Sequence, residues 1–203
     1  SLTPGSLINN GQCANNQKVT SLYVNSEGKL GVICVKDSGP ADGNGNPNNL
    51  NYLTGYDAWS FYYAQCVIVH INADEPLCFV RDQDAGGAYI KTYLKDENII
   101  KYGEKYIHNW PLHPYEALTD IIKERKWDKL SIGVEMDSHY FTAYCYEKIK
   151  SGLPNAKISD CERLVNWVRV VKSDTEINLM KAASLIVQTG MKKAFEVINP
   201  GVR

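Results

Sequence analysis

Short apolar runs alternate along this chain with segments of helical periodicity, and this alternation restricts the fold more than any other feature. The runs that predict strands are KLGVICVKD, CVIVHI, PLCFVR, NIIKY, KLSIGVEM and AKISD. Helical patterns lie between them, over DAGGAYIKTYL, over HPYEALTDIIKERKW and from Ser138 onward. The tetrapeptide NADE joins the second and third runs and predicts a hairpin. We therefore expect an α/β fold: a mixed β-sheet flanked by helices that cover both faces.

Composition excludes several classes of protein. The 203 residues suit one domain, or one domain with an appended piece. A formal net charge of -1 gives no reason to expect nucleic acid or an anionic membrane as partner. No apolar run approaches the ~18 residues of a membrane span, and no secretion signal is visible. The six cysteines have no zinc or thioredoxin spacing, so we expect reduced thiols in a cytoplasmic protein.

Two segments have little periodicity. Residues 1–28 are rich in Asn, Gly, Ser and Gln, and we expect them to be poorly ordered or divergent. SGPADGNGNPNN, from Ser38 to Asn49, contains almost only turn-forming residues. It matches neither a Walker nor a dinucleotide fingerprint, so it predicts an exposed insertion loop.

The last segment, residues 173–203, predicts one long helix. SDTE forms a capping box in which Ser173 caps the first turn and Glu176 reaches back. Asn199, Pro200 and Gly201 end the pattern. An apolar stripe follows one side of the helix and needs a large partner surface; it consists of Ile177, Met180, Val187, Met191, Phe195 and Ile198.

No catalytic set is visible from the residues alone. His70 lies inside an apolar run and is read as a core or edge histidine. Glu135 and Asp137 precede Ser138, so they are read as acidic residues near the start of the helix that Ser138 opens, rather than as metal ligands. Asp82 and Asp84 fit a turn with a helix N-cap better than a pair of catalytic carboxylates.

NYLTGYDAWSFYYAQ, residues 51–65, is the densest aromatic segment. In a strand, Trp59, Phe61, Tyr63 and Gln65 would share one face. Rings of this kind bury a large area and keep a polar group, which suits an interface or a pocket wall. A packed strand edge is the other interpretation, and the residues alone do not choose between them.

Three segments carry a resemblance to a known family. NLNYLTGYDAWSFY, IGVEMDSHYFTA and LVNWVRVVKSDTEINLMKAASLIV resemble the amino-terminal half of the creatinase/prolidase family, the pita-bread metallohydrolases. The first two segments are most similar to ectoine hydrolase, with Xaa-Pro dipeptidase as the second choice. Arg169 to Ile177 resembles the family's hinge into its catalytic half. The resemblance runs from about residue 49 to residue 203.

The resemblance implies a domain organisation. Residues 29–172 would form the creatinase/prolidase-type amino-terminal domain, a mixed sheet flanked by helices. Residues 173–203 would be the linker helix and the start of a truncated catalytic domain. The catalytic residues, and a divalent metal (Mn, Co or Zn) where one is used, would belong to that missing domain. No catalytic role, metal ligand or cofactor is therefore assigned to this chain.

The resemblance also gives the aromatic segment a role. Amino-terminal domains of this family often meet the neighbouring subunit of a homodimer and lend side chains to its active site. A phenylalanine and an arginine do so in creatinase-like members, and they align with Phe61 and Tyr63. Phe61 matches, whereas Tyr63 replaces the arginine and implies a different ligand contact. We expect Phe61, Tyr63, Trp59 and Gln65 to be the substrate-binding residues lent to the partner subunit.

The sequence thus predicts a non-catalytic, amino-terminal domain of a hydrolase that cleaves a small amide. Its function would be dimerisation and closure of an active site, as in ectoine hydrolase or a Xaa-Pro dipeptidase. Its partners would be a second copy, its own catalytic domain, and a small amide or dipeptide substrate. The alternative is a stand-alone binding or dimerisation module without hydrolase activity.

Overall fold

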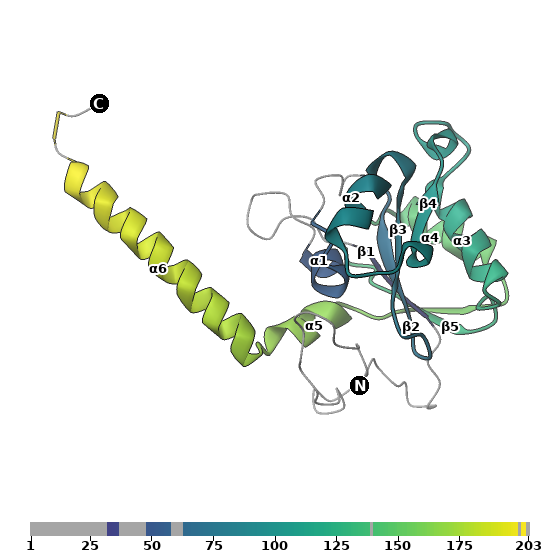
Figure 1. Cartoon of the computed structure of the whole chain (residues 1–203). Coiled ribbons are helices and arrows are strands. Elements are labelled where there is room, and N and C mark those ends of the chain that lie inside the picture. Colours follow the sequence, from purple (N-terminus) through teal and green to yellow (C-terminus); the bar gives the residue numbers. More distant parts are fainter. Residues whose placement is uncertain (1–31, 37–47, 58–62, 139, 199, 202–203) are drawn as a thin grey trace.

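The computed structural model describes residues 32–36, 48–57, 63–138, 140–198 and 200–201. Their strands and helices follow one another as β1 (Val32–Lys36), α1 (Asn48–Thr54), β2 (Cys66–His70), β3 (Leu77–Arg81), α2 (Ala85–Lys91), β4 (Ile99–Tyr102), α3 (Pro114–Glu124), β5 (Ser131–Val134), α4 (Ala143–Gly152), β6 (Lys157–Asp160), α5 (Leu164–Val170) and α6 (Asp174–Val197). Figure 1 shows a sheet with helices on both faces and α6 extending away from it.

The six described strands form one mixed sheet in the order β4-β3-β2-β1-β5-β6. β2 pairs antiparallel with β1 and with β3, and the other three pairings are parallel. The expected hairpin between β2 and β3 is present, with Val67 opposite Cys78. The expectation of a mixed β-sheet flanked by helices is confirmed.

Two apolar clusters fill the two faces of this sheet. One lies under α1, α2 and α5 and is built around Leu50, Val67 and Leu164. The other lies under α3 and α4 and is built around Phe79, Leu118 and Ile149. Neighbouring residues of β2 and β3 alternate between the two clusters, because successive side chains of a strand point to opposite faces.

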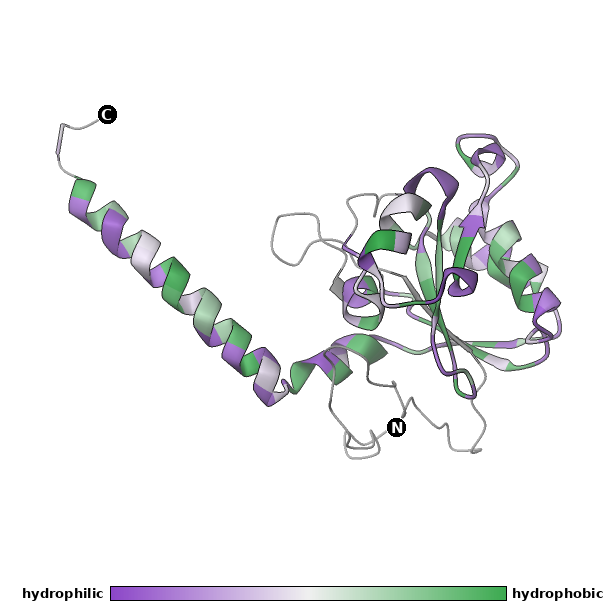
Figure 2. Ribbon diagram, viewed as in Figure 1, coloured by the Kyte–Doolittle hydropathy of each residue, from purple (hydrophilic) through white to green (hydrophobic). Residues whose placement is uncertain are grey.

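The expected long helix is present as α6. The Ser173 side chain accepts from the backbone N–H of Glu176, and the Glu176 carboxylate accepts from the backbone N–H of Ser173 at 2.7 Å. α6 has no buried residue, and Figure 2 shows apolar positions recurring along it. Helix propensity and its cap, rather than packing, therefore account for α6 within the described residues.

Four local expectations were wrong. α1 begins at Asn48, within the last two residues of the segment that we expected to be an exposed loop. Tyr63 to Gln65 are not in a strand, because β2 begins only at Cys66. α4 is capped by Thr142, whose hydroxyl accepts from the backbone N–H of Cys145, and not by Ser138. Asp84 makes no side-chain cap to α2, since its own backbone is already helical.

Candidate functional site

The four residues expected to line an active-site lip divide between described and undescribed parts of the chain. Trp59 and Phe61 lie outside the described residues, so their places are not stated. Tyr63 is half-buried at the bend before β2, and Gln65 is 2% exposed. The structure therefore places Tyr63 at the surface and Gln65 in the interior, two residues apart.

Tyr63 packs against a paired arginine. The guanidinium carbon of Arg81 lies 4.3 Å from the centroid of the Tyr63 ring. Arg81 is the last residue of β3, and β3 runs antiparallel to β2, so its side chain comes next to the start of β2. A guanidinium over an aromatic face contributes roughly 0.5–1 kcal/mol at an exposed site.

Glu104 holds the Arg81 guanidinium in place. Arg81 Nε donates to Glu104 Oε1 at 2.8 Å, and Arg81 Nη2 donates to Glu104 Oε2 at 2.5 Å. This two-point pairing fixes the plane of the guanidinium. The hydrogen bond to Glu104 raises the pKa of Arg81, and the same hydrogen bond lowers the pKa of Glu104. Both groups are charged at neutral pH, and each neutralises the other.

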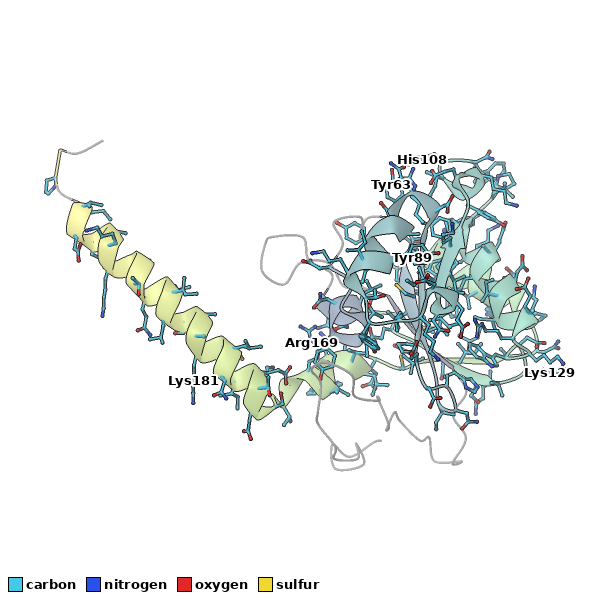
Figure 3. All side chains as sticks on the ribbon, in the orientation of Figure 1. Tyr63, Tyr89, His108, Lys129, Arg169 and Lys181 are labelled. Carbon is cyan, nitrogen blue, oxygen red and sulfur yellow. The ribbon has the colours of Figure 1, made fainter. Side chains whose placement is uncertain are left out.

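His108 forms the other side of this cluster. Its ring centroid lies 6.3 Å from that of Tyr63 at an interplanar angle of 68°, an edge-to-face contact. His108 is exposed and its φ is 49°, a backbone conformation that non-glycine residues rarely adopt. Figure 3 shows Tyr63 and His108 side by side at one end of the domain. We call Tyr63, Arg81, Glu104 and His108 the tyrosine cluster.

The tyrosine cluster is suited to binding rather than to bond cleavage. Arg81 and Glu104 neutralise each other in an internal ion pair, so the guanidinium is not a free cation that could bind an anion. Because Arg81 and His108 already fix the ring, a ligand that contacts Tyr63 has less side-chain entropy to overcome.

A second polar cluster, which the sequence did not predict, lies under α5. The Glu135 side chain is 2% exposed and its Oε1 accepts from the backbone N–H of Val165 at 3.0 Å. Its Oε2 accepts from Asn49 Nδ2 at 3.3 Å. Burial raises the pKa of Glu135, and the hydrogen bonds from Val165 and Asn49 oppose that rise.

This arrangement corrects the interpretation of Glu135 and Asp137. Both were expected near the start of a helix opened by Ser138, but they serve the start of α5 instead. Glu135 accepts from the backbone N–H of Val165, the second residue of α5. Asp137 pairs with Arg163, the residue just before α5, whose Nε lies 2.9 Å from Asp137 Oδ2. Only the parallel pairing of β5 and β6 brings these residues together, and single-sequence periodicity does not show that pairing.

Two further histidines and two cysteines have contacts that explain them by packing or capping. His70 stacks on Trp127, with ring centroids 4.5 Å apart, which agrees with its interpretation as a core or edge residue. His113 caps α3 through Nδ1, which accepts from the backbone N–H of Tyr115 at 3.2 Å. Cys66 and Cys78 are buried, and burial raises the pKa of Cys78 to about 12.

Metal-ligand sets are absent from the part of the chain that the structure describes. It contains no group of three or more His, Cys, Asp or Glu side chains that could hold a metal ion. The expected divalent metal concerns residues outside this chain and stays a prediction.

A shallow hollow of about 180 Å³ lies at the other end of the β2–β3 hairpin. Its charged residues have both signs and include Glu75, Lys95 and Arg125. Glu75 is already occupied, since its Oε2 accepts from Lys95 N–H at 3.0 Å and from Asn98 Nδ2 at 2.8 Å. The hollow is separated from the tyrosine cluster by the length of β2.

Comparison with protein families identifies the domain. A family model described as the Creatinase/Prolidase N-terminal domain matches residues 16–171. The chain belongs to the creatinase/prolidase family. Among the described helices of this creatinase/prolidase N-terminal domain, none is long and apolar enough to cross a membrane.

Curated relatives match the chain over about three quarters of its length. An uncharacterized hydrolase/peptidase, y4tM, from Sinorhizobium fredii is 41% identical over 157 residues, which are 77% of this chain and 40% of that protein. Ectoine hydrolase from Halomonas elongata is 39% identical over 158 residues, 77% of this chain and 39% of that protein. Creatinase from a Bacillus species is 26% identical, covering 76% and 35%. The chain thus spans about two fifths of the length of the first two.

Solved structures share the fold at low sequence identity. An X-Pro aminopeptidase from Thermotoga maritima superposes with a TM-score of 0.62 at 14% identity, covering 85% of this chain and 42% of that chain. A Xaa-Pro dipeptidase from Bacillus anthracis gives 0.59 at 17%, covering 84% and 40%. These likenesses concern the fold alone.

Proposed function

We propose that this chain is the non-catalytic amino-terminal domain of a hydrolase that opens or cleaves a small amide, with ectoine as the first candidate substrate and a Xaa-Pro dipeptide as the second. The observation that carries the proposal is the 39% identity to ectoine hydrolase over 158 residues. In the full protein the domain acts in the cytoplasm, in a homodimer, and its tyrosine cluster closes the active site of the neighbouring subunit.

The tyrosine cluster supports the role in site closure. A side chain that completes another subunit's pocket must be at the surface and fixed in advance. Tyr63 is half-buried and lies between Arg81 and His108. Trp59 and Phe61, proposed for the same lip, precede it in the chain. Gln65 is buried, which does not fit the direct substrate contact that we expected of it.

In creatinase-like members an arginine is expected at the position of Tyr63, and here the neighbouring Arg81 partly replaces it. Tyr63 occupies that position, but the Arg81 guanidinium lies 4.3 Å from the centre of its ring. Glu104 neutralises that charge, so the lip does not offer a substrate carboxylate a free cation. This favours a substrate with little net charge, as expected for a cyclic zwitterion, over a strongly anionic one.

The surface of α6 favours this proposal over a stand-alone module. The apolar stripe along it is exposed; Val187 is 63% exposed and Phe195 is 68% exposed. A soluble protein rarely leaves such a stripe uncovered. A catalytic domain that follows α6 in the full protein would cover the stripe. Where a divalent metal is bound there, it would polarise the amide carbonyl and activate water.

The test is hydrolysis by the full-length gene product, offered ectoine and a Xaa-Pro dipeptide side by side, with and without a chelator. We expect ring opening of ectoine by the full-length protein and none by residues 1–203 alone. Turnover of the dipeptide but not of ectoine would move the protein to the peptidases. Hydrolysis of either substrate by residues 1–203 alone would overturn the non-catalytic role.

A further inference from the structure

One buried amide joins three separate segments of this domain. Asn49, at the start of α1, is fully buried. Its Oδ1 accepts from Arg169 Nη1 at 2.7 Å, and its Nδ2 donates to Asn166 Oδ1 at 2.7 Å and to Glu135 Oε2 at 3.3 Å. Arg169 and Asn166 belong to α5, and Glu135 follows β5.

The chemistry of the partners fixes the orientation of this amide. A guanidinium can only donate, so Arg169 requires the oxygen of Asn49. The nitrogen of Asn49 then faces the two acceptors, Glu135 and Asn166. Arg169 also lies over the ring of Tyr52 in α1, with 5.7 Å between the guanidinium carbon and the ring centroid. Figure 3 shows Arg169 on α5.

A buried cluster of hydrogen-bonded side chains fixes the relative orientation of the helices that it joins more than it adds to the folding stability. Apolar side chains of similar volume often stabilise a core equally well, whereas hydrogen bonds require one relative placement of the helices that carry them. Here the bonds connect α1, which precedes the lip segment, to α5, which precedes α6. Exposed groups nearby are already paired, since Arg163 bonds Asp137 and Asp160 accepts from the backbone N–H groups of Met136 and Glu162.

We propose that Asn49, Glu135, Asn166 and Arg169 form a polar tie that sets the direction in which α5 leaves the sheet and fixes α1 in the same frame. Asn49 is at the centre of this tie and acts as a positioning residue for both α1 and α5. α1 and the chain that enters α6 are therefore held by the same four side chains. The inference rests on the proposed function only in assuming that α6 connects this domain to the catalytic domain.

Exchanging the acid and the amide tests the tie. In Glu135→Gln the new Nε2 faces Asn49 Nδ2, donor against donor. In Asn49→Asp two carboxylates meet in a buried site. In the double variant, which carries both substitutions, the new amide at residue 135 donates to the new acid at residue 49. The Asn166 amide must also turn over, so that its nitrogen rather than its oxygen faces that acid. Each contact then has a donor and an acceptor, and the net charge equals that of the wild type. Asp82→Asn, which breaks an exposed ion pair with Lys101 and touches neither α1 nor α5, is the matched control.

The measurement is amide hydrogen exchange of residues 1–203, with the peptides of α3 as an internal reference for global opening. Each single variant should speed exchange in α5 and α1 at least tenfold relative to α3, and the double variant should return to within about threefold of the wild type. Unchanged exchange in the single variants, or a double variant as fast as the faster single one, would overturn the tie.

A further variant covers the case in which Asn49→Asp does not fold. Arg169→Met removes the donor to Asn49 and the guanidinium that lies over the Tyr52 ring, and it changes no residue of α1. The tie requires faster exchange in α1 as well as in α5, whereas an effect confined to α5 would contradict it. No substrate enters these experiments, so a negative hydrolysis assay beside a positive exchange result would reject the proposed function and keep the tie.

Discussion

The guanidinium of Arg81 lies on the face of the Tyr63 ring, 4.3 Å from its centroid, while the Glu104 carboxylate accepts hydrogen bonds from Nε and Nη2 of the same guanidinium. The Tyr63 ring, which we expect at the position of an arginine in creatinase-like members, thus lies against an arginine from β3. The family resemblance pointed to Tyr63, whereas its contact with Arg81 arises only from the pairing of β2 with β3.

Truncation of Tyr63 should reduce activity more than stability. In the full-length protein we expect Tyr63→Ala to lower kcat/KM about tenfold or more, since each ~1.4 kcal/mol of lost transition-state contact is tenfold. The melting temperature should fall little, because the stacking on Arg81 contributes roughly 0.5–1 kcal/mol. Tyr89→Ala, at another tyrosine that is 40% exposed, is the control. A large loss of melting temperature with normal activity would make Tyr63 a packing residue.

The Arg81–Glu104 pair should weaken in acid. The hydrogen bond from Arg81 lowers the pKa of Glu104 in the folded state. The pair therefore adds to the free energy of unfolding above the ordinary glutamate pKa, and this contribution is lost as pH falls through the lower pKa of the folded state. Urea unfolding of the wild type and Glu104→Gln, measured from about pH 7 to about pH 2, should give free energies of unfolding that converge in acid. Asp120→Asn, at a longer surface pair, is the control. A constant difference across the range would show that ionisation of Glu104 does not matter.

Glu135 should behave in the opposite way. Burial raises the pKa of this carboxyl, so its contribution is complete below the ordinary glutamate pKa and is lost as pH rises through the higher folded value. Between about pH 4 and pH 7 the wild type should therefore lose free energy of unfolding relative to Glu135→Gln, which does not titrate there. Denaturant titrations at several pH values measure that slope. A slope of the other sign would mean that the bonds from Val165 and Asn49 outweigh burial.

Gly152 should not tolerate a side chain. A Cβ at this position would lie 2.6 Å from Thr119 Oγ1 and 2.8 Å from Thr119 Cβ, across the contact between α3 and α4. We expect Gly152→Ala to cost about 1–3 kcal/mol of folding free energy. Gly86→Ala, in α2 with no atom within 4 Å, should instead stabilise by up to about 1 kcal/mol. Chemical denaturation of both variants compares them, and a neutral Gly152→Ala would show that α3 and α4 can move apart.

Elements with a strong local pattern were predictable from the sequence. β2 and β3 are continuous apolar runs with a polar turn between them. α6 has its capping box and a regular apolar stripe, so it was expected from residue 173 onward. These patterns are local, and they needed no knowledge of the partners of each element.

The elements that were missed depend on distant residues. α1 and α5 have seven residues each, which is too short for a clear helical period. α5 is stabilised by Glu135, 30 residues away, which accepts from the backbone N–H of Val165. Asp137 was read as a charge near the next helix, but the β5–β6 pairing places it beside Arg163.

The candidate site was predictable only in part. Family resemblance indicated Tyr63, and no local pattern indicated that Arg81, Glu104 and His108 would surround it. These residues lie 18, 41 and 45 positions further along the chain by their numbers, and they meet Tyr63 only through the pairing of β2, β3 and β4. One signal was available: Arg81 ends an apolar strand with a charge, as residues at the edge of a binding surface often do.

The measurement that tests the central claim most directly is recovery of activity in mixed dimers of the full-length protein. One subunit carries Tyr63→Ala, and the other carries an inactivating substitution in its catalytic domain. If the tyrosine cluster completes the neighbour's active site, each mixed dimer has one intact site, and mixing two inactive or weakly active proteins restores amide hydrolysis. If activity does not recover although mixed dimers form, Tyr63 acts within its own subunit or not at all, and the account of the lip is wrong.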